Sequence, residues 1–313
     1  NAWIAAPNTD ITDIKAAPVG ELDVELRSWN DGDNPYELAL DGAGAALNNV
    51  ALGQSLTADH VLRFQDLIPQ ANYQLATYAL AELFTRKDEA EIAELRKAGQ
   101  AIDAVHAQVP KLLQPGRTEA EVAQELEELI LQEHTVIDFV IVGSGPNGAN
   151  PHHSFSDRVL AEGEPVVVDI GGTLPSGYHS DCTRTYVVGG DVSKAPQDFQ
   201  DAYAVLADAQ AAARAAAHPG SIAAEIDAIT RKAIAAAGWG DNFVHRTGHG
   251  IGLSTHEEPF IMEGNDLTLE EGMAFSIEPG IYVEGKWGMR LEDIVVLTSD
   301  GYESLNLAPR EVR

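Results

Sequence analysis

His245-Arg246-Thr247-Gly248-His249-Gly250 opens the stretch of sequence that decides the fold. Two further segments complete that stretch, Ser276-Ile277-Glu278-Pro279-Gly280 and Met289-Arg290-Leu291-Glu292-Asp293. Upstream, Val166-Val167-Val168-Asp169 and Ser180-Asp181-Cys182 have the same character. Each segment carries an acid or an imidazole within or at the end of a strand-like run. Together they supply two Asp, one central His and two Glu as candidates for a single site.

Carboxylates inside strands rich in Val and Ile need partners, because burying a charge is costly unless it is paired or bound to metal. Four carboxylates packed together would also repel one another and raise some of their pKa values. Two divalent cations remove that conflict, since carboxylates can bridge ions that lie about 3.5–4 Å apart. Oxygen-rich ligation with one imidazole and no thiolate favours Mn, Co or Fe over a structural Zn site. Any one acid could instead be a solvated strand end or an ion-pair partner, but five such residues in this order predict a dinuclear metal centre.

The five segments resemble the pita-bread metallopeptidases, a family that includes methionine aminopeptidase, aminopeptidase P and prolidase (Xaa-Pro dipeptidase). The resemblance extends from about Arg86 to the C-terminus, and with His256-Glu257-Glu258-Pro259 it is closest to the proline-specific members. It implies an α/β (α+β) fold: a pita-bread catalytic domain with pseudo-twofold halves, preceded by a small α/β N-terminal domain. It also implies two divalent metal ions per chain, with Mn favoured and Co, Fe or Zn as alternatives. The implied ligands are Asp169, Asp181, His249, Glu278 and Glu292.

The resemblance gives these residues roles. Asp181 and Glu292 would bridge both ions, Asp169 would complete one site, and His249 with Glu278 would complete the other. Glu278 is also the candidate for moving the proton of the attacking water, which needs hydrogen-bond reach.

Three histidines are further catalytic candidates by the same resemblance. His256 would stabilise the tetrahedral intermediate or donate a proton, and His245 would line the leaving-group side. His152 matches a substrate-contacting histidine, with His153 left open as the alternative. Arg290 and Tyr282 are in register with Glu292 and Glu278, and we expect them to hold the ligands from behind.

The step from Asp169 to Asp181 is twelve residues, whereas eleven is usual in the family. The extra residue falls in Thr173-Leu174-Pro175-Ser176-Gly177, a segment rich in turn-forming residues. We expect a hairpin loop to absorb it. Otherwise the parity of side chains would change and Asp181 would point away from the site.

The sequence pattern of residues 1–84 differs from that of residues 85–313, so we expect two domains with a boundary between residues 84 and 85. Asn49-Val50-Ala51-Leu52 is typical of a strand, and helices are expected after Thr57 and over residues 72–84. This N-terminal region is short for the domain that it resembles, and the chain starts at Asn1 without Met. Both features predict that it is truncated, and a targeting segment upstream is left open.

The catalytic region contains an internal repeat. Pro115-Gly116 and Glu121-Val122 recur as Pro219-Gly220 and Glu225-Ile226, offset by 104 residues in both cases. Each copy is expected between two helices and before a strand that carries metal ligands. The first helix is predicted to be capped by Thr85 with Asp88. Its apolar face would be Ile92, Leu95, Ala98, Ile102, Val105, Val109 and Leu112.

Composition excludes several classes of partner. The chain has 313 residues and a formal net charge of −29, which argues against nucleic acid and anionic membrane surfaces. The sequence contains no uninterrupted run of about 18 apolar residues, so no membrane-spanning helix is predicted. Cys182 is the single cysteine, so no internal disulfide forms, and we expect a cytoplasmic protein. Relatives in the resembling family are commonly dimers or tetramers, which implies a homodimer.

The predicted activity is hydrolysis of the Xaa-Pro bond of dipeptides, as in a prolidase. The alternative is an aminopeptidase P that releases the first residue of longer peptides with proline in the second position. A pita-bread binding module without catalysis is a third hypothesis, but it predicts lost ligands and none is lost.

Overall fold

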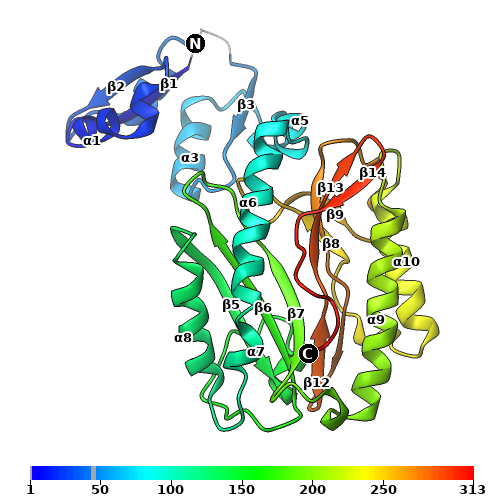
Figure 1. Cartoon of the computed structure of the whole chain (residues 1–313). Coiled ribbons are helices and arrows are strands. Elements are labelled where there is room, and N and C mark those ends of the chain that lie inside the picture. The colour runs from blue at the N-terminus through cyan, green and yellow to red at the C-terminus, as the bar shows by residue number, and fades with distance from the viewer. Residues whose placement is uncertain (1, 44–46) are drawn as a thin grey trace. The chain divides into compact units, whose positions relative to one another are not determined.

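A computed structural model describes residues 2–43 and 47–313 of the chain, which form two compact units, Asn1–Ala81 and Glu82–Arg313 (Figure 1). The first unit contains two separate pairs of parallel strands and several short helices. The second unit contains two larger sheets, each covered by long helices. No helix among the described residues is long and apolar enough to cross a membrane.

The N-terminal unit pairs β1 with β2 and β3 with β4, each pair parallel. Its elements are β1 (Trp3–Pro7), α1 (Ile11–Ala16), η1 (Pro18–Glu21), β2 (Glu25–Trp29), α2 (Pro35–Leu40), β3 (Asn49–Leu52), α3 (Ala58–Leu67), β4 (Asn72–Leu75) and α4 (Ala76–Ala79). The strand over 49–52 and the helix after Thr57 are confirmed. The prediction of a single helix over residues 72–84 is wrong, because Asn72–Leu75 is a strand that pairs with β3 and only short helices follow it. Strand pairing overrides the helical preference of this segment.

The first half of the second unit is a three-stranded antiparallel sheet in the order β5-β6-β7, with α6 and α8 packed against it (Figure 1). Its elements are α5 (Ala81–Thr85), α6 (Glu89–His106), α7 (Val109–Leu112), α8 (Glu119–Ile130), β5 (Val136–Ser144), η2 (Gly145–Ala149), β6 (Pro165–Thr173) and β7 (Cys182–Val187). The apolar faces of the helices and the valines of β6 form one buried cluster. That cluster fixes β6, and with it Asp169.

Helix α6 begins three residues later than predicted. Asp88 is its N-cap and forms a capping box with Glu91, whereas Thr85 belongs to α5. The carboxylate of Asp88 accepts hydrogen bonds from two free N–H groups of the first turn, which is why the helix starts there. The predicted apolar face is buried as far as Val105, but Val109 and Leu112 lie in the separate helix α7.

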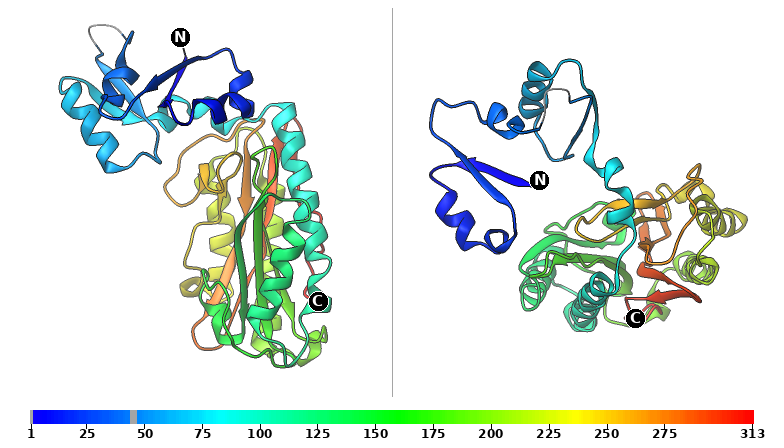
Figure 2. Two further views of the ribbon diagram at one scale, coloured as in Figure 1. Left: turned by 90° about the vertical axis from the view of Figure 1, so that its left-hand side faces the viewer. Right: turned by 90° about the horizontal axis from the view of Figure 1, so that it is seen from above.

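The second half is a five-stranded sheet in the order β14-β13-β10-β8-β9, together with the hairpin β11-β12. Its elements are η3 (Val192–Lys194), α9 (Gln197–Ala216), α10 (Ala223–Ala236), η4 (Gly240–Asn242), β8 (Gly248–Gly250), β9 (Glu257–Ile261), β10 (Ala274–Ile277), β11 (Gly280–Val283), β12 (Trp287–Arg290), β13 (Asp293–Thr298) and β14 (Gly301–Ser304). Helices α9 and α10 cover it, and the long strands of both halves lie roughly along a common axis (Figure 2, left).

Equivalent hydrogen bonds relate the two halves. The N–H of Gly116 donates to the carbonyl of Leu160, and the N–H of Gly220 donates to the carbonyl of Leu269. Isolated bridges join Thr118 to Val159 and Ile222 to Thr268 in the same way. The repeat noticed in the sequence therefore marks equivalent positions before α8 and α10.

The pseudo-twofold symmetry also relates the positions of the four acids. Asp181 immediately precedes β7, and Glu292 immediately precedes β13. Asp169 lies in β6, and Glu278 immediately follows β10, the corresponding strand of the other half. Each half thus contributes one pair of carboxylates.

A hairpin loop absorbs the extra residue between Asp169 and Asp181. Asp169 pairs with Thr183, and the bridge from Thr173 to His179 continues that register without a shift. The loop closes at Leu174, with Gly177 at its tip in the left-handed region at φ 87°. Paired residues of antiparallel strands share a face, so Asp181, two residues before Thr183, faces the same side as Asp169. The predicted loop is confirmed.

Candidate metal centre

The structure brings the four acids and the histidine into one buried cluster. Ligand atoms of Asp181, His249 and Glu292 lie within 4.8 Å of one another. The Nε2 atom of His249 is 3.6 Å from a carboxylate oxygen of Asp181 and 3.2 Å from Oε1 of Glu278. Asp169 lines the same cavity. Residues from five separate segments therefore meet where the two halves face each other.

Two carboxylate oxygens in the cluster have no protein partner. Oδ1 of Asp169 and Oε1 of Glu292 are buried and accept no hydrogen bond within the described part of the chain. Unpaired buried carboxylate oxygens are costly and uncommon, so each calls for a cation or another donor. These two atoms, together with an imidazole nitrogen, form a hard, oxygen-rich donor set that fits divalent metal ions.

The hydrogen bonds of His249 favour the tautomer that a metal ligand needs. Its Nδ1 lies 3.0 Å from the carbonyl oxygen of Gly250, which can only accept. Nδ1 therefore carries a proton, and Nε2, which lies 3.2 Å from Glu278, is the ring nitrogen that would bind a metal after losing its own proton. The backbone N–H of His249 donates to Oγ of Ser276, whose hydroxyl donates to Glu278.

Burial and mutual repulsion shift the pKa values of the acids. Burial raises the pKa of Asp181 well above its usual range, and the charges of Glu292 and Asp169 raise it further. Glu292 is raised in the same way, by burial and then by Glu278 and Asp169. Burial also opposes ionisation of Glu278, but the hydrogen bond and charge of His249 outweigh it and lower that pKa to about 2. Without cations the cluster therefore resists full ionisation, whereas bound cations would stabilise the charged form of all four carboxylates.

Arg290 contacts the acids through hydrogen bonds. Its guanidinium is buried and donates to Asp169 at 2.6 Å and to Oγ1 of Thr183 at 3.0 Å. Thr183 in turn donates to Glu292 at 2.7 Å. Arg290 thus orients Asp169 directly and Glu292 through Thr183. The sequence did not single out Thr183 or Ser276, because a hydroxyl in a strand carries no distinctive pattern.

Tyr282 and His245 extend this chain of hydrogen bonds. Arg290 donates to the hydroxyl of Tyr282 at 2.7 Å, and that hydroxyl lies 2.9 Å from Nε2 of His245. Nδ1 of His245 lies 2.7 Å from the carbonyl of Arg246, so it carries the ring proton. Both ring nitrogens of His245 are thereby occupied, and burial lowers its pKa. His245 therefore lines the cavity as a neutral ring.

The structure separates the roles of His152 and His153. Nε2 of His153 lies 2.8 Å from the buried carboxylate of Glu119, so this ring is tied to the protein. His152 is exposed and lines the cavity. The preceding carbonyl, that of Pro151, accepts a hydrogen bond from Arg290. His152 is thus the member of the pair that can meet a ligand.

Glycine lets the His152 segment approach the cluster. A Cβ at Gly288 in β12 would lie 1.7 Å from the carbonyl oxygen of Gly148 in η2. Only a residue without a side chain permits this contact, which sets η2 against β12 and so brings Pro151 to Arg290.

His256 stands over the cluster. Its ring packs 4.0 Å from the ring of His249, centroid to centroid, and it lines the cavity. Burial of part of the ring and the nearby His249 and Arg246 lower its pKa to about 4. The next residue, Glu257, forms an ion pair with the buried side chain of Lys87. That pair anchors the segment that carries His256.

Comparisons with known proteins identify the family. Residues 93–299 match Metallopeptidase family M24. Probable dipeptidase PepE of Mycobacterium tuberculosis is 50% identical over 99% of this chain and 81% of its own length. An Xaa-Pro dipeptidase of Lactobacillus delbrueckii subsp. lactis is 40% identical over 82% of this chain and 70% of its own. The crystal structure of dipeptidase PepE from Mycobacterium ulcerans has a TM-score of 0.93 at 49% identity, over 99% of this chain and 82% of that one.

The chain belongs to metallopeptidase family M24. Its membership confirms the expected pita-bread fold and makes the protein a metallopeptidase. Family M24 enzymes use divalent metals, and the Asp181, His249 and Glu292 cluster is where this chain offers ligands for one.

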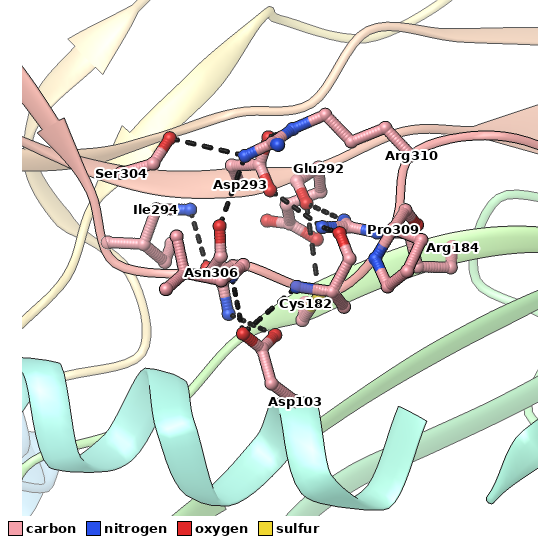
Figure 3. Close-up of polar contacts among 12 residues, drawn as sticks. Asp103, Cys182, Arg184, Glu292, Asp293, Ile294, Ser304, Asn306, Pro309 and Arg310 are labelled. Atoms are coloured by element: carbon pink, nitrogen blue, oxygen red, sulfur yellow. Dashed lines mark hydrogen bonds and ion pairs between the residues drawn. The ribbon is translucent and has the colours of Figure 1, made fainter. Parts of the chain in front are cut away.

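A second buried network braces this peptidase behind Glu292 (Figure 3). Asp293 is fully buried and accepts hydrogen bonds from Arg184 and Arg310, each at 2.7 Å. Arg184 also donates to the backbone carbonyl of Glu292 and to that of Ala308. Asp103 in α6 accepts hydrogen bonds from the backbone of the C-terminal segment. The network ties α6 and β7 of one half to β13 of the other, and it fixes the backbone of a candidate ligand.

We expect Asp293→Asn to lower the free energy of unfolding by about 3–5 kcal/mol, since removing one partner of a buried ion pair leaves buried charge uncompensated. Chemical unfolding followed by circular dichroism measures the change. The matched control is Glu303→Gln, which breaks the half-exposed pair with Arg96 and should cost less than about 1 kcal/mol. Equal effects of the two substitutions would contradict this account of the network.

The raised pKa values of Asp181 and Glu292 give a second prediction. Because the folded state holds protons that the unfolded state releases, the metal-free protein should lose stability as pH rises from about 4 towards the folded-state pKa values. Asp181→Asn replaces a carboxyl that this cluster forces to stay protonated with a side chain that is neutral at every pH. At neutral pH the metal-free variant should therefore melt at a higher temperature than the metal-free parent, by about 2–4 °C per kcal/mol gained.

Adding Mn(II) should reverse that order, because the parent gains stability from binding and the variant lacks a ligand. Differential scanning calorimetry with and without a chelator measures both effects. Asp266→Asn, at an exposed acid, is the control and should leave both melting temperatures nearly unchanged. A metal-free Asp181→Asn variant that melts below its parent would show that the carboxylates do not repel one another as described.

Proposed function

We propose that this protein is a dinuclear-metal peptidase that hydrolyses the Xaa-Pro bond of dipeptides. The observation that carries the proposal is the buried cluster of four carboxylates and one imidazole, with two unpaired oxygens, at the floor of a cavity that is lined by further histidines. The names of its relatives, dipeptidase and Xaa-Pro dipeptidase, support the substrate class. The homodimer and the cytoplasmic location stay predictions from the sequence.

The donor set is suited to two ions, with Mn favoured. Asp169, Asp181, His249, Glu278 and Glu292 are the residues that would hold them. Such ions supply Lewis-acid polarisation of the scissile carbonyl and a lowered pKa for the attacking water.

Glu278 is the proposed general base. Its pKa of about 2 keeps it ionised at neutral pH, and Ser276 fixes one of its oxygens. It would accept a proton from the attacking water and hold it for delivery to the leaving nitrogen of proline. The carboxylate reaches the reacting atoms because it projects from the end of β10 into the cavity.

His256 would act as a neutral ring. A pKa of about 4 leaves it uncharged at neutral pH, so its N–H can donate a hydrogen bond to the oxygen that becomes negative in the tetrahedral intermediate. His152, which also lines the cavity, would contact the substrate. His245 would orient Tyr282 and present its ring to the leaving-group side.

A matched pair of peptides tests the proposal. After loading with Mn(II), the protein should cleave Ala-Pro and should cleave Ala-Pro-Ala much more slowly. Glu278→Gln should lower kcat for Ala-Pro by about 10²–10⁴-fold, because the general base is lost, while Glu303→Gln should leave it unchanged. Release of alanine measured by chromatography gives the rates. Faster cleavage of Ala-Pro-Ala would make the protein an aminopeptidase P, and cleavage of neither peptide would overturn the proline-specific function.

A further inference from the structure

We propose that Glu119 is a positioning residue for the peptidase reaction: its buried carboxylate holds the segment of residues 144–156 so that His152 faces the substrate. The inference rests on the proposed function, in which His152 contacts the peptide. Glu119 is not among the described residues that line the cavity, so it acts through this segment and does not touch the substrate.

The carboxylate of Glu119 is a centre of hydrogen bonds at the start of helix α8, and it is fully buried. Oε1 accepts hydrogen bonds from the backbone N–H of Ser144 at 2.7 Å and from its hydroxyl at 2.6 Å. Oε2 accepts one from the hydroxyl of Ser156 at 2.7 Å and lies 2.8 Å from Nε2 of His153. The side-chain amide of Asn147 donates to both oxygens at 3.1 Å. Every hydrogen bond described for this carboxylate thus comes from one continuous segment.

The charge of Glu119 makes this hold strong. Burial raises its pKa, but the hydrogen bonds of Ser144 and His153 outweigh burial and lower the pKa below its usual value. Glu119 is therefore ionised at neutral pH, and hydrogen bonds to an ionised acceptor are about twice as strong as neutral ones. If the segment moved away, it would leave a buried charge without partners, which is strongly unfavourable.

The segment contacts Glu119 with some residues and the cavity with others. His153 and Ser156 contact the carboxylate. His152 and Phe155, which directly precede them, line the cavity. Because neighbouring residues share one backbone, fixing the first pair also fixes the direction of the second. A misplacement of about 1 Å in a group that contacts substrate can cost about 100-fold in rate, so the direction of His152 matters.

The other half of the catalytic unit contains a similar arrangement. Asp227 of α10, the helix equivalent to α8, is buried and accepts hydrogen bonds from the N–H and the hydroxyl of Thr247 at 3.1 and 2.8 Å. Thr247 lies two residues before His249. In each half, a buried acid on a covering helix therefore holds a segment that carries a histidine of the cavity.

A double-mutant cycle tests the inference. Glu119→Leu removes both acceptor atoms and nearly keeps the size of the side chain, so it should lower kcat/KM of the Mn(II)-loaded protein for Ala-Pro by about 10–100-fold. His152→Ala removes the group that Glu119 positions, and adding Glu119→Leu to it should lower kcat/KM by less than about twofold more. Full additivity of the two losses would overturn the inference, because a general loss of structure acts alike in both backgrounds.

Glu121→Leu is the matched control. It removes a carboxylate and its capping hydrogen bond from the same turn of α8, but Glu121 is exposed and its carboxylate bonds to the backbone of Thr118. Its kcat/KM should stay within about twofold of the parent, although the helix end is weakened. The Mn(II) affinity of Glu119→Leu, measured by calorimetry, should also stay unchanged, whereas loss of a residue that orients metal ligands costs about 10–100-fold.

Asn147→Ala is the second variant, and it decides the question if Glu119→Leu does not fold. It leaves the carboxylate in place and removes a donor to each of its oxygens. Its kcat/KM for Ala-Pro should fall several-fold, and the fall should again disappear in the His152→Ala background. A loss that persists there would contradict the inference.

Magnetic resonance of the histidine rings separates this inference from the proposed function. In chelator-treated protein with isotope-labelled histidine, the ring signal of His152 is identified by its absence from His152→Ala. It should shift or broaden in Glu119→Leu and Asn147→Ala but not in Glu121→Leu. An unchanged His152 signal in the first two variants would overturn the inference. Failure of the parent to hydrolyse Ala-Pro would overturn the proposed function, while the His152 signal would still decide what Glu119 holds.

Discussion

Mutual repulsion among four closely placed carboxylates, three of them buried, is the constraint on which the catalytic unit depends. Burial and proximity raise the pKa values of Asp181 and Glu292, so the apolar strands around them hold a cluster that is unfavourable by itself. Arg290 and the hydroxyls of Thr183 and Ser276 orient the acids but leave two oxygens unpaired. Without metal, a site of this kind lowers the stability of the folded protein, and bound divalent cations restore it. Functional sites commonly lower stability in this way.

The pseudo-twofold explains how one chain places four acids at one point. In each half, one acid lies in or directly after a strand (β6 or β10), and a second acid directly precedes the strand that pairs with it (β7 or β13). Because the two halves face each other, these two pairs of acids meet. The arrangement needs a brace, since carboxylates that repel would otherwise push the halves apart. Arg184, Asp293 and the C-terminal segment supply it behind Glu292 (Figure 3).

Much of this was predictable, because acids and a histidine within apolar strands are rare and their spacing is informative. The ligand candidates, the hairpin loop and the repeat before α8 and α10 were all read from local pattern. The braces were not, since Arg184 and Asp293 are 109 residues apart and no periodicity links them. The segment 72–84 was misjudged because its strand forms only by pairing with β3. The choice between His152 and His153 required Glu119, which a sequence alone cannot place beside His153.

The central claim is that these acids hold two divalent cations between the halves, and anomalous diffraction from crystals grown with Mn(II) tests it most directly. The account predicts two peaks per chain, about 3.5–4 Å apart. Asp181 and Glu292 should contact both peaks, and His249 should contact one of them through Nε2. A single peak, or peaks that Asp181 and Glu292 do not share, would contradict the account.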